Sequence, residues 1–175
     1  MTIALLDAQG LSETHAAMRD TARRFATTEI APIAAELDES ERYPAELYRS
    51  LAEAGLFGIT VPEALGGAEA DALAYALVME ELSRGYASVA DQVGLVELLG
   101  TLLTQHGTAA QQSRYLAPLL KAERRCAYAL TEAGAGSDLG SLKTEAKRDG
   151  AGWVLNGAKL WIHNAPIADF AAVLA

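Results

Sequence analysis

The sequence predicts a mainly α chain with a partial β-domain, and three observations indicate this. Apolar residues recur at helical spacing up to about residue 122, and short strand-like runs replace them from Arg125 onward. Hydrophobic residues make up 51% of the 175 residues, which is enough for a real core. The apolar run 170–175 reaches the end of the sequence without a stop signal. We therefore expect an all-α domain over 1–122 and the first, truncated part of a β-domain over 123–175.

Two helices are expected in the first third of the chain. Ser12 can cap a helix that runs to about Leu37, and Pro32 should bend or divide it near its end. Pro44 is suited to the first residue of a second helix and Gly55 to its end. The residues expected to face the core are Met18, Ala22, Phe25, Ile30, Ile33, Leu47, Tyr48 and Leu51.

A loop over 56–67 should lead to a third helix over 69–84 and a fourth over 88–106. The fourth is apolar on most faces, which predicts a central position. Glu97 interrupts it and can be interpreted in two ways. Its carboxylate lines a pocket, or it faces solvent or a helix partner, as such groups more often do.

A last short helix is expected from a cap at Thr108 to about Leu119, after Gly107 ends the preceding one. The β part should contain short strands joined by a hairpin turn over 149–152. The expected strands cover 126–130, 142–148, 153–155, 160–162 and 170–175.

Composition excludes several function classes. The net charge is −9, and the acidic excess lies in residues 1–85, which hold 15 acidic and 6 basic residues. An acidic chain without a basic block argues against nucleic acid as a partner. The single cysteine, Cys126, fits a core strand residue in a reducing compartment. Three scattered histidines give no ligand spacing, so we expect no metal site.

Membrane insertion is not expected either. Residues 1–7 have no basic n-region and only a very short apolar run, unlike a signal peptide. The longest apolar tract, 93–103, is interrupted by Glu97 and is shorter than the roughly 18 residues that a spanning helix needs. These features predict a cytoplasmic protein.

The strongest local feature is the run 128–138, in which a strand leads into a glycine-rich loop. Gly134 and Gly136 would let backbone N–H groups approach a phosphate, and Ser137 could donate to it. A plain surface loop with turn residues is the alternative. The dinucleotide βαβ fingerprint is absent because Leu139 stands at the third glycine position and a strand-like run follows.

A second candidate is the run Trp161-Ile162-His163-Asn164. An aromatic side chain next to hydrogen-bonding ones could wall a planar ring system. A buried tryptophan in a sheet explains the same pattern. The local sequence leaves both interpretations open.

Taken together, four segments resemble the acyl-CoA dehydrogenase family, and their order and spacing match it over residues 11–175. The segments are ELSRG (81–85), YALTEAGAGSD (128–138), KT (143–144) and LNGAKLWI (155–162). The resemblance implies an acyl-CoA dehydrogenase-like N-terminal helical bundle followed by an incomplete β-barrel or sandwich. No segment resembles the family's C-terminal four-helix domain.

The implied activity is FAD-dependent α,β-dehydrogenation of an acyl-CoA thioester. In this family a carboxylate removes the α-proton while the β-hydrogen leaves as hydride to the flavin. That carboxylate lies in the C-terminal domain, so the resemblance implies no catalytic residue in this chain. A free 175-residue chain is therefore expected to be inactive and to bind FAD poorly.

The resemblance also implies site residues by position. Tyr128, Leu130 and Thr131 would lie by the isoalloxazine, and Gly136 and Ser137 nearer the ribityl–pyrophosphate. The other side of the ring would be flanked by Trp161, Ile162 and His163. Substrate contacts would come from Ser137 to the CoA moiety, and from Ala90 and Gly94, whose small size suggests room for a bulkier or longer acyl group.

Two positions depart from the family pattern. Ala133 replaces a proline, a minor change in loop stiffness. His163 stands where family members usually place a Thr or Ser whose hydroxyl reaches flavin N5. The family's usual electron acceptor therefore does not follow for this chain.

The implied partners are the acyl-CoA substrate, electron-transfer flavoprotein or another acceptor, and further copies of the chain in a homo-oligomer when complete. Two alternatives remain. One is an acyl-CoA oxidase or flavin monooxygenase relative. The other is a non-catalytic, partner-binding fragment, which the open strand edge near Ala175 would favour.

Overall fold

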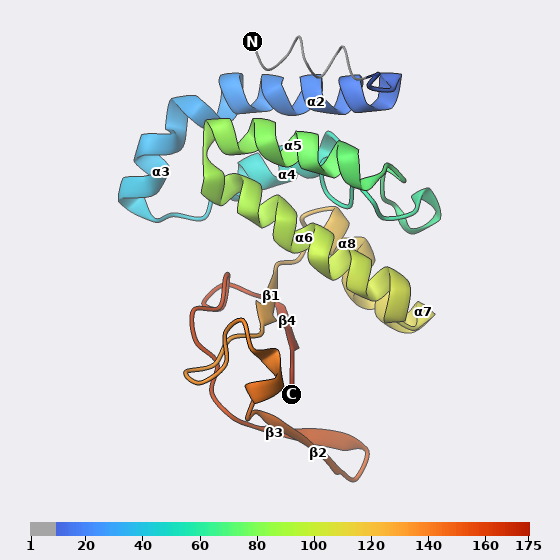
Figure 1. Ribbon diagram of the computed structural model, residues 1–175, viewed down its shortest axis with the longest axis vertical. Helices are drawn as coiled ribbons and strands as arrows, with labels where there is room; N and C mark the ends of the chain where they lie inside the picture. The colour runs from blue at the N-terminus through green and yellow to red at the C-terminus, as the bar shows by residue number, and fades with distance from the viewer. Residues whose placement is uncertain (1–9) are drawn as a thin grey trace. The chain divides into compact units, whose positions relative to one another are not determined.

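The computed structural model describes residues 10–175, and these form two compact units (Figure 1). The helical unit extends to Glu123, and the β unit comprises Arg124–Ala175. A mainly helical chain with a small partial sheet is what the sequence predicted, so the fold class is confirmed. The prediction that no signal peptide occupies residues 1–7 lies outside the described residues.

The first helical stretch is divided, as Pro32 predicted. It contains α2 (Glu13–Phe25), a π-helical turn (Ala26–Ile30), a 3₁₀ turn (Ala31–Ile33) and α3 (Ala34–Ser40). The Ser12 hydroxyl caps α2 by accepting from the His15 N–H at 3.2 Å. Pro32 stands inside the 3₁₀ turn, and its missing N–H leaves no donor for a regular helical hydrogen bond there.

The second helix is α4 (Ala45–Glu53), which begins directly after Pro44. Leu47, Tyr48 and Leu51 are buried, as their spacing predicted. The chain leaves α4 through Gly55, whose φ of 74° favours glycine.

The third helix, α5 (Ala72–Gly85), begins later than predicted. Asp71 is its cap and accepts from the Ala74 N–H at 2.9 Å, so the chain before it remains a loop. Helix α5 packs against α2 and against α6 (Ala87–His106) (Figure 1).

The fourth helix, α6, is central to the helical unit because it contacts α5 and α8 (Ala117–Leu120). By length and composition alone it could also cross a membrane, but half of its most apolar stretch is buried inside the structure, as in a core helix. The short helix α7 (Ala109–Gln111) leads through a π-helical turn (Gln112–Leu116) to α8. Thr108 caps α7, as predicted.

Glu97 on α6 lies in neither of the places considered for it. Its side chain is buried, with 5% exposed, and faces the loop that follows α4. One carboxylate oxygen accepts from the Ile59 N–H at 2.7 Å, and the other from the Thr60 N–H at 2.8 Å and the Thr60 hydroxyl. Glu97 therefore fastens a loop to the central helix.

The β unit contains two pairs of strands. β1 (Cys126–Ala129) pairs in parallel with β4 (Phe170–Val173). β2 (Glu145–Asp149) and β3 (Gly152–Asn156) form an antiparallel hairpin that turns at Gly150 (Figure 1).

The strand predicted over 160–162 is wrong. Trp161 has a φ of 56°, in the left-handed region that a strand cannot use, and turns follow it up to residue 167.

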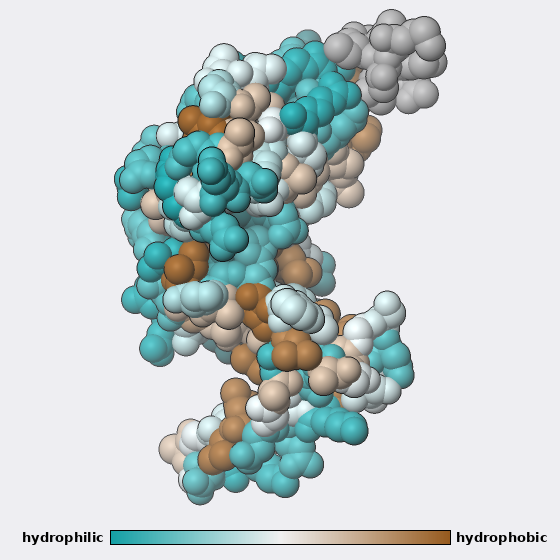
Figure 2. Space-filling model, turned by 90° about the vertical axis from the view of Figure 1, so that its left-hand side faces the viewer, coloured by the Kyte–Doolittle hydropathy of each residue, from teal (hydrophilic) through white to brown (hydrophobic). Residues whose placement is uncertain are grey.

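Apolar surface remains exposed in the chain, and Figure 2 shows it as brown patches on an otherwise polar face. The large exposed hydrophobic residues of the β unit are Leu139, Trp153, Val154, Leu155, Leu160, Trp161 and Val173.

Candidate functional site

The glycine-rich loop begins directly where β1 ends. A tight turn forms inside it, because the Glu132 N–H donates to the Ala135 carbonyl at 2.9 Å and the Ala135 N–H donates back at 3.2 Å. Gly134 and Gly136 are exposed, and a Cβ added at either would meet nothing within 4 Å. The backbone there is open to approach by a ligand such as a phosphate.

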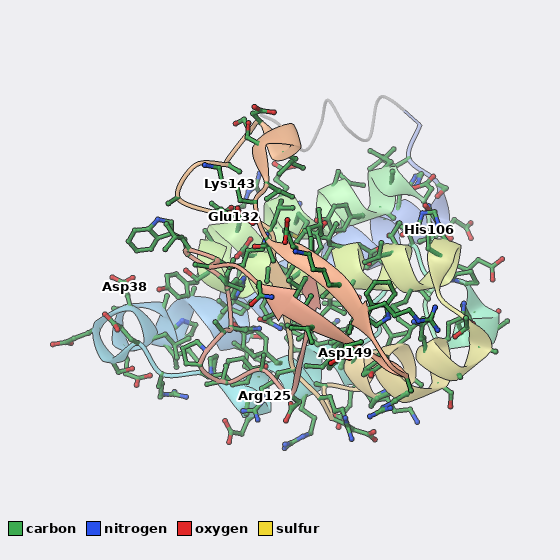
Figure 3. The ribbon with its side chains drawn as sticks, turned by 90° about the horizontal axis from the view of Figure 1, so that it is seen from below. Asp38, His106, Arg125, Glu132, Lys143 and Asp149 are labelled. Atoms are coloured by element: carbon green, nitrogen blue, oxygen red, sulfur yellow. The ribbon has the colours of Figure 1, made fainter. Side chains whose placement is uncertain are left out.

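Glu132 anchors this loop to the segment that leads into β2. Its carboxylate accepts from the Lys143 N–H at 2.7 Å, from the Thr144 N–H at 3.0 Å and from the Thr144 hydroxyl. Figure 3 shows Glu132 and Lys143 close to one another. Only 9% of Glu132 is exposed, so the carboxylate is almost fully enclosed by these donors.

Lys159 completes the set of donors around Glu132. Its ammonium group lies 2.8 Å from the carboxylate and also donates to the Leu130 carbonyl at 2.9 Å. The lysine, the Thr144 hydroxyl and the backbone N–H groups together lower the pKa of Glu132 to about 2. The Glu132 carboxylate is therefore ionised at neutral pH.

Residues 157–160 lie directly against the loop. The Leu160 N–H donates to the Thr131 carbonyl at 2.9 Å, next to the Lys159 contacts. A Cβ at Gly157 would stand 2.2 Å from the Thr144 hydroxyl oxygen and 2.7 Å from the Thr144 Cα, so only glycine permits this approach.

Trp161 follows immediately and does not lie in the core. Its side chain is 94% exposed, which contradicts a buried tryptophan in a sheet. A bulky aromatic residue at positive φ is an uncommon backbone state. The indole is therefore free to stack on a flat ligand.

The turn after Trp161 is tied back to β1. Asn164 adopts a φ of 61°, and its side-chain amide donates to the Cys126 carbonyl at 3.2 Å. At the far end of the turn, the Arg125 N–H donates to the Asp169 carboxylate at 2.7 Å. Residues 162–169 thus return to the strand that begins the glycine-rich loop.

The predicted cofactor residues all lie in the β unit, and the structure brings their two segments together through residues 159–160. Exposure divides them into two groups. The half-buried group is Tyr128, Leu130, Thr131, Ile162 and His163, and the exposed group is Gly136, Ser137 and Trp161.

The two predicted acyl-pocket residues lie on α6 in the helical unit. Ala90 is buried and Gly94 is half-buried. A Cβ at Gly94 would lie 3.2 Å from the Tyr75 hydroxyl oxygen and 3.3 Å from the Met79 Cε. The missing side chain at Gly94 therefore permits close packing of α5 on α6, which its small size alone did not reveal.

Cys126 is a core strand residue, as its sequence context predicted. It is fully buried, and burial raises the pKa of its thiol to about 12. It is not a candidate nucleophile. Within residues 10–175, no group of three or more His, Cys, Asp and Glu side chains could hold a metal ion.

The residues that sequence reasoning left without a role are Glu132, Thr144 and Lys159. All three stand inside the segments that carried the family resemblance. Their presence in those segments was the signal that could have pointed to a role for them. Their contacts with one another are visible only in the structure.

The arrangement suits a ligand with a phosphate and a planar ring. Open glycine backbone and the Ser137 hydroxyl can approach the phosphate, and the exposed indole can cover a ring. A flavin dinucleotide has both parts, so the residues present fit such a group.

Comparison with known proteins identifies one family over nearly the whole chain. The family model of the acyl-CoA dehydrogenase N-terminal domain matches residues 12–123, and that of the middle domain matches residues 127–175. The 3-(aryl)acrylate reductase of Clostridium sporogenes is 42% identical over 165 residues, covering 94% of this chain and 44% of the relative. The mitochondrial short-chain specific acyl-CoA dehydrogenase of Bos taurus is 44% identical over 167 residues, covering 94% of this chain and 40% of the relative.

A solved structure is similar over nearly the same share of this chain. The glutaryl-CoA dehydrogenase of Mycobacterium smegmatis in complex with FADH2 aligns with a TM-score of 0.87 at 30% identity, over 93% of this chain and 42% of that one. The chain thus spans less than half the length of the relatives that it matches.

Proposed function

The chain belongs to the acyl-CoA dehydrogenase family, and from this premise we propose that it is the N-terminal part of an enzyme that uses FAD to dehydrogenate an acyl-CoA thioester at its α,β-carbon bond. The observation that carries the proposal is the open glycine loop held against the segment of the exposed Trp161. When bound, FAD supplies the hydride acceptor.

The proposed cofactor contacts follow the two segments. Backbone N–H groups near Gly136 and the Ser137 hydroxyl bind the ribityl–pyrophosphate part. The isoalloxazine lies by Tyr128, Leu130 and Thr131. Its other side is flanked by the residues of the second segment, Trp161, Ile162 and His163.

On the substrate side, Ser137 contacts the CoA moiety, while Ala90 and Gly94 border the acyl group. By their names, one relative is a 3-(aryl)acrylate reductase and another is a short-chain specific acyl-CoA dehydrogenase. We therefore place the substrate among short-chain and aryl acyl-CoA thioesters.

We propose that the carboxylate that removes the α-proton lies outside these 175 residues, because the chain spans only 40–44% of its relatives. The functional enzyme is proposed to be a cytoplasmic homo-oligomer that passes electrons to electron-transfer flavoprotein or a similar acceptor.

The test uses the protein purified from the cells that make it. A denaturing mass spectrum should show FAD together with the polypeptide that contains this sequence. Anaerobic addition of butyryl-CoA, glutaryl-CoA or an aryl acyl-CoA should then bleach the flavin absorbance with at least one of them.

The absence of FAD would overturn the proposal in favour of a non-catalytic fragment that binds a partner. Flavin bleaching followed by oxygen consumption and hydrogen peroxide release would instead assign the protein to the oxidases that share this scaffold.

A further inference from the structure

Three consecutive residues of the glycine-rich loop are held from one side by two consecutive residues of another segment. The Lys159 ammonium binds the Leu130 carbonyl and the Glu132 carboxylate, and the Leu160 N–H binds the Thr131 carbonyl. These contacts join residues 27 to 29 positions apart in the sequence. The contacts of Lys159 and Leu160 with residues 130–132 thus set the separation between the glycine-rich loop and the Trp161 segment.

The charges at this place are enclosed. The side chain of Lys159 is 11% exposed, and that of Glu132 is 8% exposed. Breaking such a pair leaves the remaining charge buried and unpaired, which is costly. The contact is therefore a rigid joint, unlike an exposed ion pair that forms and breaks freely.

The joint lies between the two groups of residues proposed to contact FAD. Leu130 and Thr131 immediately precede Glu132, and Trp161 stands two positions after Lys159. A small change in the joint would therefore move both proposed walls of the ring site relative to each other. Ligand contacts built from two segments depend on such supporting residues.

We propose that Glu132 and Lys159 are positioning residues which hold the glycine-rich loop and the Trp161 segment at the separation that FAD requires. This inference rests on the proposed function for the identity of the ligand. It assigns no chemical step to either residue. The joint between Glu132 and Lys159 is measurable without FAD.

The first test uses the 175-residue chain with Trp153→Phe, which leaves Trp161 as the sole tryptophan of these residues. Lys159→Met removes both lysine contacts but keeps much of the side-chain volume. In the Lys159→Met variant the fluorescence anisotropy of Trp161 should fall, because the Trp161 segment gains freedom of motion. In the Lys159→Arg variant the anisotropy should stay close to that of the parent. Equal anisotropy in the parent and in Lys159→Met would overturn the proposal.

The matched control is Glu97→Gln in the same background. Glu97 has the same pattern of backbone and threonine donors but lies in the helical unit. The Glu97→Gln substitution should lower the temperature of unfolding and leave the Trp161 anisotropy unchanged. A similar anisotropy loss in this control would show a general loosening and would also overturn the proposal.

The second test uses the holoprotein and follows the release of FAD by its fluorescence. The Lys159→Met variant should release FAD at least about tenfold faster than the parent. The release rate of the Lys159→Arg variant should lie within about threefold of the parent's rate. An unchanged release rate would overturn the positioning role while leaving the FAD proposal intact. If no holoprotein forms, the FAD proposal fails, and the anisotropy still decides whether the joint positions the segment.

Discussion

The helical unit and the β unit use the same device to hold a loop, and they differ in one added residue. In each, a buried glutamate accepts two consecutive backbone N–H groups and the hydroxyl of a threonine. Glu97 holds Ile59 and Thr60. In the β unit the corresponding donors to Glu132 are Lys143 and Thr144.

The difference is the lysine. Lys159 binds Glu132, whereas none of the ion pairs found among residues 10–175 includes Glu97. In the helical unit the glutamate joins two segments, and its carboxylate alone is sufficient for this. The β unit joins three segments, and the third leads to an exposed tryptophan. We infer that the same device stabilises a core in one unit and supports a binding site in the other.

The largest expected effect comes from breaking the device in the helical unit. Glu97→Ala leaves two backbone N–H groups and a hydroxyl without acceptors, so we expect a loss of about 3 kcal/mol in the free energy of unfolding. Urea denaturation followed by far-UV circular dichroism would measure it.

The control for this change is Glu80→Ala on α5. Glu80 pairs with Arg84 on the surface, and such a pair contributes about 0.5 kcal/mol. Equal losses in the two variants would show that Glu97 stabilises the fold no more than a surface residue does.

Acid should act on the β unit through Glu132. Its pKa is about 2 in the folded chain, below the ordinary value of 4.5, so ionisation stabilises the fold fully above about pH 4.5. That contribution is lost as the pH falls from 4.5 towards 2. Both tryptophans, Trp153 and Trp161, lie in the β unit. Their fluorescence should therefore report the acid unfolding of this unit.

Glu132→Gln provides the matched variant, because it keeps the shape and removes the ionisable group. Its unfolding free energy at pH 7 should fall, and its dependence on pH between 4.5 and 2 should flatten. An undiminished acid dependence would assign the transition to other carboxylates.

A smaller effect should separate substrate recognition from cofactor binding. Gly94→Phe forces the ends of the Tyr75 and Met79 side chains aside and fills the proposed acyl border. We expect activity on bulky acyl-CoA thioesters to fall about tenfold more than activity on butyryl-CoA, with an unchanged FAD content. Equal losses across chain lengths would remove Gly94 from the acyl site.

The smallest effect concerns the buried thiol of the β unit. Because burial raises the pKa of Cys126 to about 12, the folded chain should react with a thiol reagent at pH 8 only very slowly. The rate should rise sharply in denaturant. Rapid labelling of the folded chain would show that β1 opens readily and that the site is less rigid than we infer.

Local signals in the sequence predicted much of the fold. The caps at Ser12 and Thr108 and the break at Pro32 depend on neighbouring residues, and each was found as predicted. Trp161 misled the prediction because a run of Leu, Trp and Ile favours a strand, while its positive φ leaves no sign in the sequence.

The supporting contacts of the site could not be predicted, because their partners are far apart in the chain. Thirty-seven positions separate Thr60 from Glu97, and 27 separate Glu132 from Lys159. Periodicity describes one element at a time and says nothing of such pairs. The sequence motif therefore located the loop, while the structure identified what holds it.

The most direct test of the central claim is hydroxyl-radical footprinting of the holoprotein, read by mass spectrometry before and after removal of FAD. Trp161 is 94% exposed and Trp153 is 65% exposed in the chain, so both report at residue level. We predict that bound FAD protects Trp161 severalfold and leaves Trp153 unchanged. Equal oxidation of Trp161 with and without FAD would contradict the claim that this segment forms a wall of the flavin site.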